Sequence, residues 1–134
     1  MFRKIRSLLA QRKLPADKIV GLRADDDSIL LVGVASPRDR IELRRIDRIV
    51  AYKRDMGTSD LVCFLVTFRI DDQSIWHVTL HEDLPGFLDA DQAFARLPSY
   101  DANWRDRVIK PAFSTNETVI YDATISDAAR AGAL

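Results

Sequence analysis

The chain has 134 residues, of which 47% are apolar and 30% are charged, and its formal net charge at pH 7 is zero. This composition is ordinary for a soluble globular protein, and the length suits one domain. No apolar run approaches the ~20 residues that a membrane-spanning helix needs, and no secretion signal follows Met1, so we expect a cytoplasmic protein. We expect a single globular domain over residues 1–122 and a mobile tail over residues 123–134.

The zero net charge conceals an asymmetry between the two parts of the chain. Residues 1–54 carry 14 Lys and Arg against 7 Asp and Glu, whereas residues 55–134 carry 6 against 13. Either the two parts neutralise each other in the folded domain, or they form a dipolar surface that attracts a charged partner or a second copy.

Residues 1–14 are predicted to form a basic amphipathic helix that ends at Pro15. Its apolar residues recur at helical spacing: Phe2, Ile5, Leu8 and Leu9. Its cations are the candidate binding residues: Arg3, Lys4, Arg6, Arg12 and Lys13. We expect the apolar stripe to dock on the domain. A membrane surface, nucleic acid and self-association remain alternative uses of this helix.

Short strands joined by polar turns are predicted from residue 18 to residue 53. The strand candidates are residues 18–22, 28–34, 40–43 and 48–53, the last of them after a turn at 44–47. Residues 44–54 also fit a helical pattern, so that assignment stays open. The three aspartates Asp25–Asp27 lack the alternating ligands and the central glycine of a calcium loop, and they indicate a solvated hairpin tip.

The longest strand signal is the run from Asp60 to Ile70, which is rich in β-branched and aromatic residues. Both of its faces are apolar, so we expect a central strand that is covered on both sides. Residues 75–80 form the second strand of a hairpin. A three-residue loop at 71–73 would set Trp76 opposite Phe68, whereas a two-residue loop would set it opposite Thr67. The single cysteine, Cys63, is expected to be a small buried apolar residue.

Two helices are predicted after this hairpin. The first has an acidic entrance, with Glu82 or Asp83 as the capping residue, and runs from Phe87 to Leu97. The second runs from residue 104 to residue 110, and a last short strand covers residues 118–122. The buried face of the first helix is assigned to Phe87, Leu88, Phe94 and Leu97.

The candidate catalytic residues are His77, His81 and Glu82, which could supply an acid–base pair to a small hydrolase-like enzyme. The two histidines lie four residues apart, which on an extended strand separates them by ~13 Å. Two ligands of one zinc ion each lie about 2 Å from the metal, so we expect no metal site. No phosphate loop or dinucleotide fingerprint occurs, and we expect no cofactor.

The order of several short motifs resembles a set of small bacterial proteins of unassigned function. The motifs are Lys53-Arg54-Asp55, Thr58-Ser59-Asp60, His81-Glu82-Asp83 with Gly86-Phe87, Trp104, and Pro111-Ala112-Phe113 with Asn116. The resemblance covers roughly residues 51–122, implies a stand-alone bacterial domain, and implies no activity. The succession of strands that ends in a helix is also similar in pattern to pleckstrin-homology-like domains.

These observations predict an α+β fold, with one curved antiparallel sheet of six or seven strands, an N-terminal helix and two C-terminal helices. A pleckstrin-homology-like half-barrel is the preferred architecture. The expected function is that of a non-enzymatic binding or adaptor module with a protein partner or a second copy of itself. The hydrolase-like enzyme and a structural homo-oligomer are the alternatives.

Overall fold

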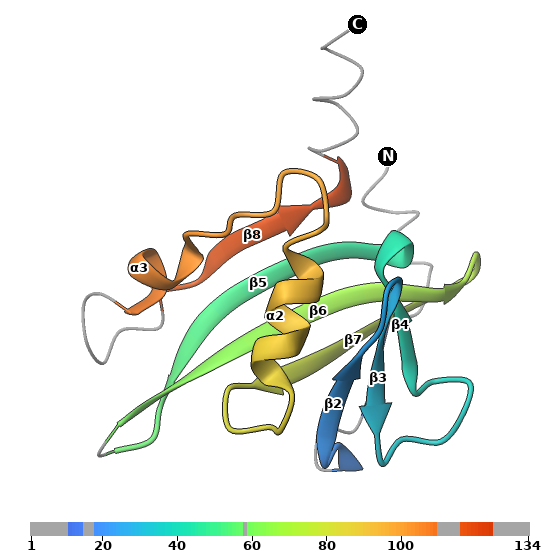
Figure 1. The fold of residues 1–134 in the computed structure, drawn as a ribbon, viewed down its shortest axis with the longest axis horizontal. Coiled ribbons are helices and arrows are strands. Elements are labelled where there is room, and N and C mark those ends of the chain that lie inside the picture. Colours follow the sequence, from blue (N-terminus) through green and yellow to red (C-terminus); the bar gives the residue numbers. More distant parts are fainter. Residues whose placement is uncertain (1–10, 15–17, 58, 110–115, 125–134) are drawn as a thin grey trace, which may run out of the picture.

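The computed structural model describes residues 11–14, 18–57, 59–109 and 116–124, and within them it shows an α+β fold with two separate sheets (Figure 1). The larger sheet has the strand order β1 (Gln11–Lys13), β7 (Ser74–His81), β6 (Asp60–Asp71), β5 (Ile46–Asp55), β8 (Thr118–Asp122). The smaller sheet consists of β2 (Gly21–Ala24), β3 (Ser28–Val32) and β4 (Arg40–Glu42). The helices are the 3-10 turn η2 (Leu43–Arg45), α2 (Phe87–Phe94) and α3 (Trp104–Ile109).

The prediction of α+β structure is confirmed, but the prediction of one antiparallel sheet is wrong. The strands divide into a five-stranded and a three-stranded sheet, and β1 pairs parallel to β7. The five-stranded sheet is open and does not close into a barrel. The separation arises after β4, because η2 interrupts the chain before β5 begins a new strand in the larger sheet.

The hairpin of β6 and β7 is the centre of the larger sheet, and its register follows the first of the two predicted alternatives. Phe68 lies opposite Trp76, and Phe64 lies opposite Leu80. The loop itself is shorter than predicted, because Asp71 pairs with Ser74 and the register shifts by one residue between Arg69 and Asp71. A bulge there absorbs the extra residue without turning the apolar side chains away from the core.

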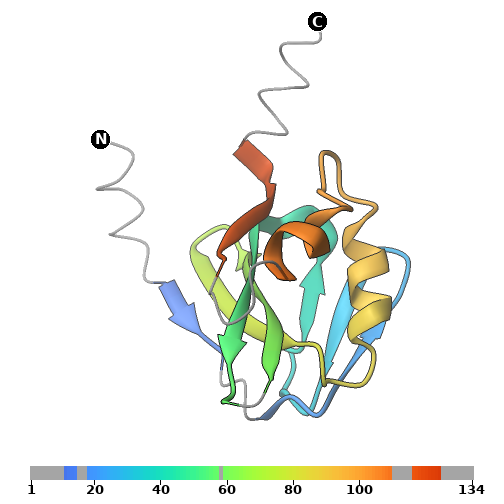
Figure 2. The ribbon, with the colours of Figure 1, turned by 90° about the vertical axis from the view of Figure 1, so that its left-hand side faces the viewer.

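The core lies between the larger sheet on one side and α2 with the smaller sheet on the other (Figure 2). Its centre is an aromatic cluster around Phe64, whose ring centroid lies 4.8 Å from that of Phe87 and 4.9 Å from that of Trp104. Phe94 completes the cluster at 6.0 Å from Phe64. These four rings pack in the space between the sheet and the two helices.

The N-terminal prediction is wrong for residues 11–13, which form the edge strand β1 and not the end of a helix. Arg12 pairs with Trp76, and the Leu14 amide donates to the His77 carbonyl at 3.0 Å. These bonds satisfy backbone groups of the β7 edge, and such tertiary pairing outweighs local helix propensity. Residues 1–10, on which the rest of the predicted helix depends, lie outside the described residues.

The entrance of α2 is built on a glycine and not on the predicted acidic cap. Gly86 is the N-cap residue, with φ 88°, and a Cβ atom there would lie 2.0 Å from the carbonyl oxygen of Leu22. The Leu22 amide donates to the Pro85 carbonyl at 2.7 Å, which brings the helix entrance directly against β2. Glycine alone fits this close approach at positive φ. The prediction that Leu88 faces the core is also wrong, because that side chain is 65% exposed.

The two faces of the larger sheet differ, although the sequence of β6 predicted that both are covered. Phe64, Val66 and Phe68 are fully buried in the core. On the opposite face, Cys63 is fully buried, whereas Leu65 and Thr67 are half-buried and line hollows. This face of the central strand is therefore covered at Cys63 and only partly covered at Leu65 and Thr67.

Candidate functional site

The three candidate catalytic residues do not converge on one site. The Glu82 carboxylate accepts a hydrogen bond from the Val62 amide at 3.0 Å, and the Glu82 amide donates to the Val62 carbonyl at the same distance. Glu82 therefore holds the end of the hairpin. His77 pairs with Thr67, whereas His81 pairs with Cys63 further along the strand. His77 lines the hollow on the partly covered face of the sheet, and neither His81 nor Glu82 lines it with His77.

Cys63 and His81 lie opposite each other on β6 and β7, where Cys63 is fully buried and His81 is half-buried. The His81 Nδ1 atom is buried and has no hydrogen-bond partner among the described residues. Burial raises the pKa of the Cys63 thiol, which suppresses the reactive thiolate. This agrees with the interpretation of Cys63 as a small buried residue, since its side chain is fully inaccessible.

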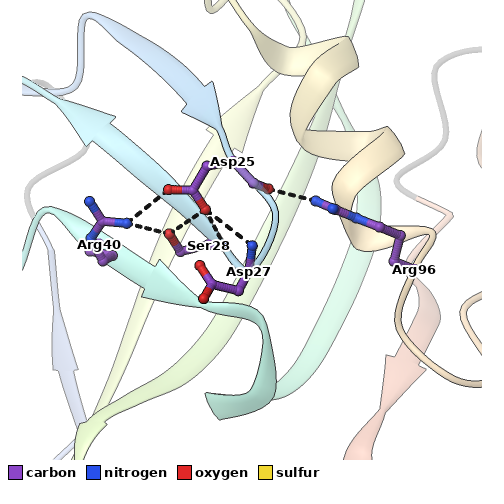
Figure 3. Close-up of polar contacts among 5 residues, drawn as sticks. All are labelled: Asp25, Asp27, Ser28, Arg40 and Arg96. Carbon is purple, nitrogen blue, oxygen red and sulfur yellow. Dashed lines mark hydrogen bonds and ion pairs between the residues drawn. The ribbon is translucent and has the colours of Figure 1, made fainter.

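One aspartate of the hairpin tip, Asp25, is engaged by protein donors (Figure 3). The Asp25 carboxylate accepts hydrogen bonds from the Ser28 hydroxyl at 2.9 Å and the Asp27 amide at 3.1 Å, and it pairs with Arg40 at 3.0 Å. The hydrogen bond from the Ser28 hydroxyl is the largest of the effects that lower the pKa of Asp25 far below its usual range. Arg96 from the segment after α2 donates to the Asp25 carbonyl at 2.7 Å. This cluster therefore connects the hairpin tip to β4 and to the end of α2.

The described part of the chain contains a basic pocket with a volume of about 800 Å³. It lies where the end of β1 meets the loop between β3 and β4 and the turn of the β6–β7 hairpin. Four cations from three segments line it: Arg12, Lys13, Lys18 and Arg38. All four side chains are exposed, and none forms an ion pair with another described residue.

Trp76 forms the apolar wall of this pocket and orients two of its cations. The guanidinium carbon of Arg38 lies 4.6 Å from the centroid of the indole, and that of Arg12 lies 5.6 Å from it. Trp76 itself is only 6% exposed. The buried ring is thus a fixed platform, and the cation–π contacts restrict the two guanidinium groups before any ligand binds.

The pocket has an excess of positive charge. Asp71 is the one carboxylate among the described lining residues, and its Oδ1 atom already accepts the Gln73 amide at 2.8 Å. That hydrogen bond is the main cause that lowers the pKa of Asp71, so the group stays ionised and belongs to the hairpin turn. The four cations outnumber the single carboxylate, which is already hydrogen-bonded within the turn, so the charge of the pocket favours an anion. Two hydroxyls, of Ser36 and Ser74, are further polar groups on its wall.

Sequence reasoning found half of this pocket. Arg12 and Lys13 belonged to the predicted binding residues, and the structure places both in the pocket wall. Arg3, Lys4 and Arg6 lie outside the described residues. Three residues of the pocket wall were not predicted: Lys18, Arg38 and Trp76. The local sequence gives no sign of a binding role, because Trp76 lies in the apolar pattern of a strand and Arg38 lies in a turn. The parallel pairing of β1 with β7 places Arg12 beside Trp76, and the loop between β3 and β4 brings Arg38 to the same ring.

Neither a metal-binding cluster nor a membrane-spanning helix occurs in the described part of the chain. No group of three or more His, Cys, Asp or Glu side chains is positioned there to hold a metal ion. No described helix has the length and apolar character that crossing a bilayer requires. Comparison of the chain with protein-family models, with curated proteins and with solved structures finds no match.

Proposed function

We propose that this protein is a non-enzymatic binding module that holds a phosphate-bearing ligand in the basic pocket. The observation that carries the proposal is the pair of arginines, Arg12 and Arg38, held against the buried ring of Trp76. A guanidinium group offers a planar fork of donors that matches a phosphate group, and here two forks from different segments face one hollow.

Charge favours a phosphate over a carboxylate as the bound group. A phosphomonoester carries about −1.5 to −2 charges at pH 7, whereas a carboxylate carries one. The pocket holds four cations and one carboxylate that is committed to the hairpin turn. The doubly charged group therefore neutralises more of the repulsion among the cations.

The hydrolase-like alternative has less support, because the Glu82 carboxylate is bonded to the Val62 amide and lies apart from His77. We further propose that the protein is located in a bacterial cytoplasm and that its architecture is pleckstrin-homology-like. The resemblance of residues 51–122 to small bacterial proteins supports the location. The strand-rich fold, in which α2 packs on β2 and β3, supports the architecture.

The test is isothermal titration calorimetry of the full-length chain with glycerol 3-phosphate as the probe. Acetate and phosphatidylcholine vesicles that contain phosphatidic acid are titrated in parallel. We expect saturable binding of the phosphomonoester and much weaker binding of acetate. Binding of the vesicles alone would assign the phosphate to a lipid headgroup. The absence of binding to every phosphate probe would refute the proposed function.

Two substitutions with the same change in charge show whether the pocket is responsible. Arg38→Gln removes a guanidinium from the pocket and is expected to weaken phosphate binding by about ten- to a hundredfold, the value of a charge-assisted hydrogen bond. The matched control is Arg44→Gln, because the Arg44 side chain is 78% exposed and lies outside the pocket. Equal losses in both variants would indicate non-specific electrostatic attraction and would contradict the proposal.

A further inference from the structure

The basic pocket is larger than a phosphate group alone requires. Its volume of about 800 Å³ falls within the ~300–1,000 Å³ that is typical of pockets for whole small molecules. A phosphate group occupies only part of that space. The ligand of this pocket therefore has a second part, and the rest of the pocket wall indicates the chemistry of that part.

Apolar side chains from three segments line the pocket beside its cations. Leu14 and Trp76 are buried and belong to the core side of the wall. The others are half-buried or exposed, and they lie in the loop between β3 and β4 and near the hairpin turn: Val34, Ala35, Pro37 and Ile70. The second part of the ligand is therefore expected to be uncharged and in contact with apolar groups.

The position of Arg38 indicates that this second part is planar. The guanidinium carbon of Arg38 lies over the Trp76 ring at 4.6 Å from its centroid, and the Arg38 side chain is exposed and lines the pocket. The ring covers one face of the guanidinium, so the opposite face is the one that a ligand in the pocket can reach. An arginine plane of this kind is a surface on which nucleic-acid bases stack.

A base suits this surface better than an acyl chain does. An acyl chain against the guanidinium would remove water from a charged group without replacing its interactions, which is unfavourable. The π electrons of a base, in contrast, attract the cation. Stacking also leaves the N–H donors of Arg38 available, because they lie in the guanidinium plane and stacking uses its faces.

We propose that the basic pocket binds a free nucleotide, with the base stacked on the Arg38 guanidinium and the phosphate held by Arg12, Lys13 and Lys18. This inference rests on the proposed function, because it takes the phosphate site as given. The size of the pocket suits one nucleotide. Stacking uses the π face that every base has, so the site accepts purines and pyrimidines alike.

The test is isothermal titration calorimetry of the full-length chain with AMP and with ribose 5-phosphate. The two probes carry the same phosphate on the same sugar and differ in the base. We expect AMP to bind about tenfold or more tightly than ribose 5-phosphate, the factor that one stacked base supplies. Equal affinities would overturn this inference and leave the proposed function standing. Binding of neither probe, nor of glycerol 3-phosphate, would refute both.

Two variants separate stacking from charge. Arg38→Lys keeps the positive charge and removes the plane, so the ratio of the two affinities should fall to near one. The matched control is Lys18→Gln, which removes a charge and leaves Arg38 on Trp76, and it should weaken both probes by the same factor. Both substituted side chains are exposed, so we expect both variants to fold, and equal denaturation midpoints check this. An unchanged ratio in Arg38→Lys would contradict the stacked position of the base.

A last titration distinguishes a free nucleotide from the end of a nucleic-acid strand. The probe is a single-stranded tetranucleotide with a 5′-phosphate. We expect it to bind no more tightly than AMP, because the pocket accommodates one nucleotide. Binding more than about tenfold tighter than AMP would show that further bases contact the protein, and it would overturn the assignment to a free nucleotide.

Discussion

The two tryptophans of this chain occupy regions that differ in what surrounds the ring. Trp104 is 1% exposed, its Nε1 atom donates to Asp91 at 3.2 Å, and Phe64 packs edge-on against it. Trp76 is also buried, at 6%, but borders a hollow. Each ring has an arginine nearby, with Arg105 at 4.8 Å from Trp104. The presence of an arginine on an indole therefore does not mark a site. The Trp76 region is distinguished by two such arginines from different segments beside an open space.

The comparison predicts that the region around Trp104 supports the stability of the fold and that the region around Trp76 supports binding. The largest effect should follow Phe64→Ala, which removes the ring that contacts Phe87, Phe94 and Trp104. We expect the free energy of unfolding to fall by about 3–5 kcal/mol, because the ring is fully buried and leaves a cavity. Chemical denaturation measures this. The matched control is Leu88→Ala on the exposed side of α2, which should change stability by about 0.5 kcal/mol or less. Comparable losses of stability in both variants would contradict the stabilising role of the region around Trp104.

An intermediate effect is expected at alkaline pH from Tyr100, which donates its hydroxyl to Asp91 at 2.6 Å. Burial, and next the hydrogen bond to Asp91, raise the pKa of Tyr100 above its ordinary value of 10. The folded state therefore keeps a proton that the unfolded state releases, so stability is fully present below pH 10 and falls as the pH rises further. The contribution of this one group is about 1.4 kcal/mol per pH unit.

Urea denaturation between pH 9 and pH 11 measures this contribution as a slope. Tyr100→Phe should flatten the slope and, at neutral pH, cost about 0.5–1.5 kcal/mol for the lost hydrogen bond. Leu88→Ala, which removes no ionisable group, is the control and should leave the slope unchanged. An equal slope in the Tyr100 variant and the native chain would contradict this prediction.

The smallest effect on stability should come from the binding region itself. Arg38→Gln removes one exposed cation–π contact, which corresponds to about 0.5–1 kcal/mol, and it also relieves repulsion from Arg12 and the two lysines. We expect the midpoint of denaturation to stay within the error of the native value, while the indole emission of Trp76 shifts. A large loss of stability in this variant would show that Arg38 is a structural residue like those around Trp104.

The hairpin was predicted from the alternation of apolar and polar residues, but its register was left open between two alternatives. The structure has the register that places Trp76, Val78 and Leu80 beside Phe68, Val66 and Phe64. Strand β8 was also predicted correctly, because Thr118–Asp122 is a short β-branched run after a helix.

The parts that depend on contacts between distant segments were not predictable. Residues 11–13 continue a helical pattern in the sequence, and only the free edge of β7 makes them a strand. The cap at Gly86 depends on the carbonyl of Leu22, which lies 64 residues earlier in the chain. The basic pocket needs Arg12, Arg38 and Trp76 from three separate segments. No local pattern in the sequence contains such juxtapositions.

The edge strand β1 connects the basic pocket to the edge of the larger sheet. It has three residues and one neighbouring strand, and it places Arg12 beside Trp76. A phosphate bound to Arg12 would hold β1 in register on β7. Ligand binding and the pairing of β1 with β7 would stabilise the same conformation and would be thermodynamically linked, so each would favour the other by an equal factor. A molecule that displaced β1 from the edge of β7 would then release the ligand, and it would act as a negative effector of the pocket.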